Sequence, residues 1–196
     1  MKKKELQEKI IKVAKEFLNK KDYHEVVIDE VAKKAGVAKG TIFFYFKTKE
    51  NFIKEIFKSE IEELCAMVEN VAKQNLPTIE KLKLLYDNYA DNVLKKIHLF
   101  MMLRKEMVCQ DYKIHSLVKT EYKKIAEKLI PIVEQGYKEG VFKKYTTNPL
   151  SSEIITSMVF TYGLSVAHFV VETRGKKDYN KIKEIFWQIL LHGIMK

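Results

Sequence analysis

The chain has 196 residues, with 36 Lys or Arg against 26 Asp or Glu, and a formal net charge of +10. This length is sufficient for one or two domains with a true hydrophobic core. The two cysteines, Cys65 and Cys109, occur in a chain without a signal peptide, so reduced cysteines in the cytoplasm are expected.

The positive charge is concentrated near the N-terminus. Residues 1–58 hold 15 lysines and 9 acidic residues, a balance of +6, which leaves +4 for the longer remainder. A basic end on a nearly balanced body is typical of a protein with one part that meets phosphates, although a general lysine bias is an alternative. Arg104 and Arg174 are the only arginines. Because lysine is a flexible point charge, we expect strong, salt-dependent phosphate attraction and modest base specificity.

The first element expected along the chain is an amphipathic helix over residues 3–19, with six apolar residues on one face. Two short helices joined by a glycine turn follow over residues 32–46. Gly36 stands where the first of them must end in a left-handed residue, which glycine adopts without strain. Val37 and Ile42 are expected to face the small core of this hairpin. The residues left exposed on the second helix are Lys39, Gly40, Thr41, Phe44 and Tyr45.

A helix-turn-helix presents the N-terminal part of its second helix to base edges, whereas an ordinary helical hairpin with a solvated lysine face is the alternative. Further positions repeat a known pattern at intact spacing: Ala14, Phe17, Tyr23, Ile28, Val31-Ala32, Ala35-Gly36-Val37, Lys39-Gly40-Thr41-Ile42, Tyr45-Phe46-Lys47 and Lys49-Glu50. With these positions, residues 10–52 resemble the DNA-binding domain of the TetR family of transcriptional regulators. The resemblance covers about a quarter of the chain.

The resemblance implies which residues meet DNA. Four residues of the second helix would meet the major groove, and Thr41, Tyr45 and Lys49 would hold phosphates. The full set of expected DNA-binding residues is Lys39, Gly40, Thr41, Phe43, Phe44, Tyr45, Lys47 and Lys49. Base readout is expected from Lys39, from Thr41 and from apolar contact of Phe44 with a thymine methyl.

Three places depart from the usual pattern of the family. Val26-Val27 stand where a Thr or Ser usually precedes the helix that begins near Ile28, Ala38 replaces a frequent serine, and Phe43 replaces a tyrosine. Each change removes a polar group that would cap a helix or meet the DNA backbone. Asp29 can still favour the dipole of its helix from the first turn.

Beyond the motif, no glycine occurs between Thr41 and Gln135, and apolar residues recur at helical spacing. This pattern predicts stacked helices rather than a sheet. The expected helices span residues 49–72, 78–95, 97–108 and 112–137. Gly136 and Gly140 are expected to end the last of these, and a further helix is expected between Asn148-Pro149 and Gly175.

Residues 154–171 contain no Asp, Glu, Lys or Arg. A membrane span is one interpretation, but five Ser, Thr and His residues interrupt the apolar run, so we favour a buried helix. A helix that is apolar on nearly every side needs cover on nearly every side, and a partner subunit is the economical cover. The family resemblance also implies dimerisation through the last two long helices. The expected interface residues are Ile155, Met158, Val159, Tyr162, Val166, Phe169, Ile182, Phe186, Ile189 and Leu190.

The middle helices are rich in aromatic and methionine side chains, which suit an adaptable apolar pocket. The family resemblance implies that such a pocket binds a small effector and that binding moves the helix after Thr48, so that the DNA-binding units no longer match the groove spacing. Core packing is the alternative for each residue. The expected ligand-binding residues are Met67, Tyr86, Tyr89, Phe100, Met101, Leu103, Met107, Tyr122 and Phe160.

No pattern typical of catalysis or metal binding occurs in the sequence. Its five histidines are scattered, without a His-x-x-x-His or Cys-x-x-Cys pair, a phosphate loop or a nucleophile elbow. We therefore expect no enzyme activity, no metal and no cofactor. Burial and redox sensing both stay open for Cys109.

These patterns predict an all-α protein with a three-helix, helix-turn-helix DNA-binding domain over residues 1–47 and a helical effector-binding and dimerisation domain over 48–196. The expected function is that of a cytoplasmic, homodimeric TetR-like repressor, released from a palindromic operator by a small apolar or amphipathic ligand. Its partners would be double-stranded DNA, a second copy and that effector, without a membrane. One alternative is a DNA-binding factor of the same fold that acts with a protein partner. The other is a helical ligand-binding protein or enzyme whose lysine-rich end contacts a membrane surface.

Overall fold

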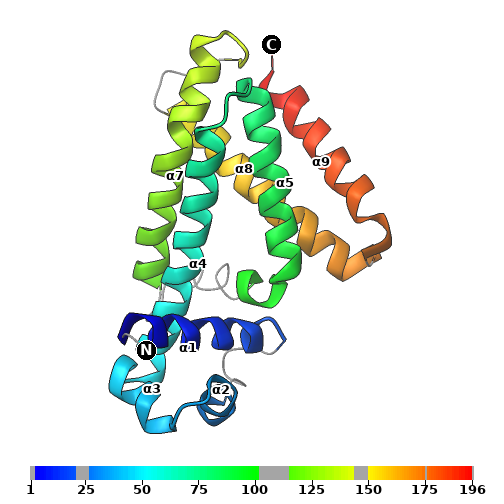
Figure 1. Ribbon diagram of the computed structural model, residues 1–196. Helices are drawn as coiled ribbons and strands as arrows, with labels where there is room; N and C mark the ends of the chain where they lie inside the picture. The colour runs from blue at the N-terminus through cyan, green and yellow to red at the C-terminus, as the bar shows by residue number, and fades with distance from the viewer. Residues whose placement is uncertain (1–2, 21–26, 102–114, 144–149, 175, 196) are drawn as a thin grey trace. The chain divides into compact units, whose positions relative to one another are not determined.

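The computed structural model describes residues 3–20, 27–101, 115–143, 150–174 and 176–195 (Figure 1). The elements of the described residues are helices, and the prediction of an all-α fold is confirmed. Their bounds are α1 (Lys3–Leu18), α2 (Ile28–Ala35), α3 (Lys39–Phe46), α4 (Lys49–Ala72), α5 (Thr78–Lys95), α7 (His115–Lys138), α8 (Leu150–Phe169), η1 (Val170–Arg174), η2 (Lys176–Asp178) and α9 (Tyr179–Ile194). An isolated antiparallel bridge joins Phe142 to Met195.

The chain forms two compact units. The first unit comprises Met1–Glu62 and Lys96–Glu121, and the second comprises Glu63–Lys95 and Tyr122–Lys196. The chain therefore passes from one unit to the other within α4, directly after α5 and within α7.

In the first unit, α1 packs against α2 and α2 against α3. Ile10, Val31 and Ile42, one from each helix, are almost completely buried and form part of this core. Gly36 ends α2 with φ 70°, and the N–H groups of Gly36 and Val37 bond the carbonyls of Lys33 and Ala32 at 3.2 and 3.0 Å. The predicted glycine turn between two short helices is therefore confirmed. Helix α1 ends at Leu18, one residue before the expected end.

In the second unit, α8 packs against α5 and α9 (Figure 1). Gly163 allows α8 to approach α5 closely, because a Cβ at this position would lie 2.6 Å from Cδ1 of the buried Tyr89. One turn earlier on α5, the ring of Tyr86 lies 5.3 Å from the ring of Trp187 of α9. These aromatic contacts hold α5 against both α8 and α9.

One expected helix end is wrong. Helix α7 continues through Gly136 to Lys138, and only Gly140 adopts a left-handed conformation, with φ 73°. Gly136 serves packing, because a Cβ there would lie 2.1 Å from the ring of Phe142. The sequence pattern could not distinguish a glycine needed for this contact from one that ends a helix.

The helices expected over 49–72 and 78–95 have the bounds that the sequence predicts. The helix expected over 97–108 is helical over residues 97–101, and its remainder lies outside the described residues. After Phe169, a π-helical turn continues α8 as far as Arg174, and Gly175, its expected end, also lies outside the described residues.

The stretch Glu153–Glu172 has a mean hydropathy of 1.7 and the length to cross a membrane, but 41% of it is buried within the structure. Core helices of globular proteins share these properties, so they are weak evidence for a membrane span.

Candidate nucleic-acid interface

Helix α3 has one buried and one exposed face. Ile42 and Phe46 are buried against the rest of the first unit, whereas Phe44 on the opposite face is 65% exposed. Of the other expected DNA-binding residues, Lys39, Gly40, Phe43 and Lys47 are exposed, and Thr41, Tyr45 and Lys49 are half-buried. Because apolar side chains of this size are normally covered, an exposed phenylalanine beside lysines is consistent with a surface that meets a partner.

An ion pair occupies the N-terminal end of this surface. Nζ of Lys39 lies 2.9 Å from Oδ2 of Asp29, in the first turn of α2, and both side chains are more than half exposed. Exposed pairs of this kind contribute little to stability. An incoming anion could therefore displace the carboxylate from Lys39 at little cost in stability.

The two short helices lack side-chain caps. Val27 at the N-cap of α2 and Ala38 at the N-cap of α3 make no capping hydrogen bond, as the sequence predicts from the missing Thr or Ser. Asp29 and Glu30 provide negative charge in the first turn of α2, but the first turn of α3 contains no acidic residue. The positive end of the α3 dipole is thus directed at the exposed surface, where it attracts anions.

A strained turn joins α3 to α4. Lys47 has φ 67° and ψ −54°, and the N–H of Thr48 bonds the carbonyl of Phe46 at 2.8 Å, which is the rarer, positive-φ form of a γ-turn. Among the described residues, Lys47 is the one non-glycine residue with positive φ. Its ammonium lies 5.4 Å from the centre of the Phe44 ring. The hydroxyl of Thr48 then accepts a hydrogen bond from the N–H of Asn51, which caps α4.

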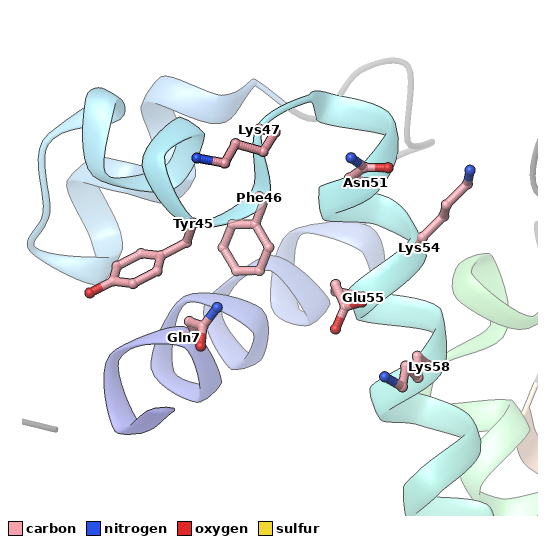
Figure 2. A pocket seen from close by; sticks show the side chains of 8 residues that line it. All are labelled: Gln7, Tyr45, Phe46, Lys47, Asn51, Lys54, Glu55 and Lys58. Carbon is pink, nitrogen blue, oxygen red and sulfur yellow. The ribbon is translucent and has the colours of Figure 1, made fainter. Parts of the chain in front are cut away.

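A pocket of about 450 Å³ opens beside this turn, between α1, α3 and the first turns of α4 (Figure 2). Its lining residues are Gln7, Tyr45, Phe46, Lys47, Asn51, Lys54, Glu55 and Lys58. Figure 2 shows the ring of Phe46 in the middle of the group, with Gln7 of α1 below it and Lys58 farther along α4. Lys54 pairs with Glu50 at 2.8 Å. The pocket residues from α1 and from beyond the first turn of α4 are not among the expected DNA-binding residues. The four-residue spacing of Lys54 and Lys58 is the one signal in the sequence that places two of them on one helix face.

The expected ligand-binding residues are distributed over both units. Tyr86 and Tyr89 are buried and Met67 is half-buried in the second unit, whereas Phe100 is buried and Met101 half-buried in the first. Leu103 and Met107 lie outside the described residues, as do the side chains of Tyr122 and Phe160. The Tyr86 hydroxyl donates a 2.8 Å hydrogen bond to the carbonyl of Lys183, and burial raises the pKa of Tyr86. This hydroxyl therefore holds α9 and needs no ligand.

Two buried hydroxyls that sequence analysis missed have no hydrogen-bond partner in the described structure. They are Oη of Tyr137, in α7, and Oγ1 of Thr156, in α8, and both residues are less than 10% exposed. A buried hydroxyl without a partner costs about 1–3 kcal/mol. Both atoms are therefore candidates for contact with a bound molecule. A threonine in an apolar helix usually bonds its own backbone, so the sequence carried no signal for this arrangement.

The expected dimer-interface residues differ in exposure. Ile155, Val159, Val166, Ile182 and Leu190 are buried within one chain, Met158, Tyr162 and Phe186 are half-buried, and Phe169 and Ile189 are exposed. The apolar residues that α8, η1 and α9 leave exposed are Ile154, Phe169, Val171, Ile185 and Ile189. We call these five residues the apolar face.

Residues 10–56 match the family described as "Bacterial regulatory proteins, tetR family". The fatty acid metabolism regulator protein of Bacillus subtilis is 25% identical over 186 residues, which cover 94% of this chain and 93% of that protein. The transcriptional regulator QacR of Staphylococcus aureus is 40% identical over 55 residues, which cover 28% of this chain and 29% of QacR. Both relatives are regulators.

The fold is similar to that of solved regulators along nearly the whole chain. FadR of Bacillus subtilis in complex with stearoyl-CoA matches with a TM-score of 0.78 and 23% identity, over 95% of this chain and 98% of that one. The fatty acid degradation regulator FadR of Bacillus halodurans matches with a TM-score of 0.75 and 21% identity, over 95% and 98% of the two chains. The similarity thus extends through both units.

Proposed function

Because the chain belongs to the TetR family of transcriptional regulators, we propose that it is a dimeric repressor that a long-chain fatty acyl-CoA releases from its operator. The observation that carries this proposal is the similarity to the fatty acid metabolism regulator of Bacillus subtilis over 94% of the chain, well beyond the helix-turn-helix. The fold similarity to a regulator in complex with stearoyl-CoA supports the same ligand class.

DNA contact is assigned to a domain over residues 1–47 and to the residues immediately after it. The exposed face of α3 supplies Lys39, Gly40 and Phe44 to the major groove. The uncapped N-terminus of α3 and the lysines at 47 and 49 attract phosphates. A palindromic operator follows from dimerisation, because two reading helices related by a two-fold axis meet successive major grooves.

Residues 48–196 are assigned to effector binding and dimerisation. An acyl chain needs an apolar lining, which the middle helices provide, and a thioester or amide needs hydrogen-bond donors. Tyr137 and Thr156 offer such donors, because their buried hydroxyls have no partner among the described residues. The apolar face on α8, η1 and α9 is the surface that a second copy would cover.

The test uses the duplex that the wild-type protein selects from a random-sequence pool. Its dissociation constant is measured by fluorescence anisotropy alone and with stearoyl-CoA, with free coenzyme A and stearate as controls. We expect stearoyl-CoA to weaken DNA binding by about 5- to 150-fold, the usual range of allosteric coupling, and coenzyme A to have no effect. Equal affinity for DNA with and without stearoyl-CoA would contradict this effector. It would favour the alternative of a DNA-binding factor that acts with a protein partner.

A further inference from the structure

A buried carboxylate lies between two lysines in the first unit. Glu60 of α4 is completely buried, and its Oε2 lies 3.2 Å from Nζ of Lys15 of α1. Nζ of Lys96, the residue after α5, donates to both Glu60 oxygens at 2.8 and 2.9 Å. Lys15 itself is only 7% exposed. We call these three residues the Glu60 cluster.

Stability alone does not account for such a cluster. Burying charged groups removes their hydration, and replacing a buried ion pair with apolar residues of similar size is often neutral or stabilising. Breaking the pair by removing one partner is strongly unfavourable, because a charge is then left buried. A buried ion pair therefore favours the one arrangement of its helices in which every buried charge has its partner.

The Glu60 cluster lies close in sequence to points at which the chain passes from one unit to the other. The chain leaves the first unit after Glu62, two residues beyond Glu60, and re-enters it at Lys96. Two of its three passages between the units therefore adjoin the cluster. A displacement of α5 in the second unit would move Lys96, because a single peptide bond joins it to Lys95, the last residue of α5.

A second ion pair, next to the cluster on α1, joins α1 to α2. The residue after Lys15 on α1 is Glu16, which pairs with Lys34 of α2 at 2.7 Å, and this hydrogen bond lowers the pKa of Glu16. Helix α2 packs against α3. Lys96, Glu60 and Lys15 thus hold one side of α1, while Glu16 and Lys34 join α1 to the helix-turn-helix.

We propose that the Glu60 cluster positions α1, and with it α2 and α3, for operator binding, and that Lys96 carries the effector response to these helices. The first part requires only that the protein binds DNA. The second part rests on the proposed function, because it assumes an effector in the second unit. Lys96 is a positioning residue and does not contact DNA in this proposal.

The test compares Lys96→Met with Lys95→Met. Both variants lose one positive charge, at adjacent positions, but Lys95 is exposed on α5 and makes no contact with the Glu60 cluster in the described structure. On the duplex selected by the wild-type protein, we expect K95M to bind within about twofold of wild type. We expect K96M to bind about tenfold more weakly, within the range for mutations that alter coupling without touching a ligand. Equal effects of the two variants would overturn the proposal.

A triple variant, K15M/E60M/K96M, separates positioning from mere stability. It removes all three charges and fills the space with side chains of similar length, so its melting temperature is expected to equal or exceed that of the wild type. We expect its operator binding to stay at least about fivefold weaker and its response to stearoyl-CoA to shrink. Wild-type DNA affinity and a wild-type response to stearoyl-CoA in this variant would show that the cluster only fills the core.

If stearoyl-CoA does not act on the wild type, the proposed effector is wrong. The comparison of K96M with K95M without effector still decides the positioning role.

Discussion

At the scale of single residues, an ion pair with Asp29 holds Lys39, the first residue of α3. In the proposed complex with DNA, Lys39 would leave Asp29 to contact a phosphate, and the Asp29 carboxylate would repel the DNA backbone. We expect Asp29→Asn to strengthen operator binding by about two- to fivefold, since both effects are modest at an exposed site. Anisotropy titrations would measure this, with Asp178→Asn in the second unit as a control for the same charge change.

A double-mutant cycle tests the reason for that gain. In the Lys39→Ala background, Asp29→Asn can relieve only the repulsion of phosphates, so its effect should be smaller than in the wild type. An equal gain in both backgrounds would show that the ion pair itself plays no part.

The orphan hydroxyl of Thr156 gives a prediction in which stability and binding change in opposite directions. Thr156→Val keeps the shape but removes a buried hydroxyl without a partner, so the free energy of unfolding should rise by about 1 kcal/mol. If the hydroxyl contacts the effector, the affinity for stearoyl-CoA should fall at the same time. Urea denaturation and a binding titration measure the two quantities, and Thr161→Val at an exposed position of α8 is the matched control. Increased stability with unchanged affinity would remove Thr156 from the effector site.

At the scale of elements, the contact of α5 with α8 depends on one missing side chain. A Cβ on Gly163 would overlap the ring of Tyr89, whose side chain is buried, so Gly163→Ala should lower the free energy of unfolding by about 1–3 kcal/mol. Gly40→Ala in α3 is the control, because nothing lies within 4 Å of its added carbon. There the higher helix propensity of alanine should leave stability unchanged or raise it by up to about 1 kcal/mol. Equal effects of the two changes in urea denaturation would contradict this account of the packing.

The contact of α5 with α9 predicts a dependence of stability on pH. Burial alone raises the pKa of Asp91, but the hydrogen bonds donated by Lys183 at 2.9 Å and Tyr179 at 2.7 Å, together with the positive charges of Lys183 and Lys95, outweigh it and hold that pKa below its ordinary value. A carboxyl whose pKa is depressed on folding stabilises the fold above its unfolded pKa of about 3.9, and this stabilisation disappears as the pH falls through the folded value. We expect stability to decline below about pH 4 and Asp91→Asn to flatten the decline. Denaturation curves across this range would show an unchanged slope in the variant if the network were unimportant.

The helices also show how much of the fold could be predicted from the sequence alone. The bounds of α4 and α5 follow from local signals, because each helix repeats apolar residues at helical spacing and starts after a threonine or a proline. Gly136 was misassigned because its role depends on Phe142, which belongs to the following loop. The Glu60 cluster was not predicted either, because a glutamate and two lysines far apart in the sequence look like solvated surface until the fold brings them together.

At the scale of the whole molecule, the apolar face predicts the oligomeric state. Ile185 and Ile189, on one side of α9, are 49% and 54% exposed in a single chain. We expect a wild-type dimer and a monomeric Ile185→Glu/Ile189→Glu variant in sedimentation velocity, because two charges cannot be buried in an apolar interface. Val27→Glu changes an apolar residue of similar exposure in the first unit and should leave the dimer intact. A dimeric double variant would place the interface elsewhere.

The uncapped N-termini of α2 and α3 have a thermodynamic consequence. Helices of eight residues are too short to persist alone, and without side-chain caps their first turns depend on their neighbours. In the proposed complex, DNA phosphates would supply acceptors for these first-turn N–H groups. We therefore expect operator binding to order these helices further, which would release heat and remove conformational entropy. Warming should therefore weaken DNA binding by disordering these eight-residue helices, even where the charges on the protein and on the DNA stay the same.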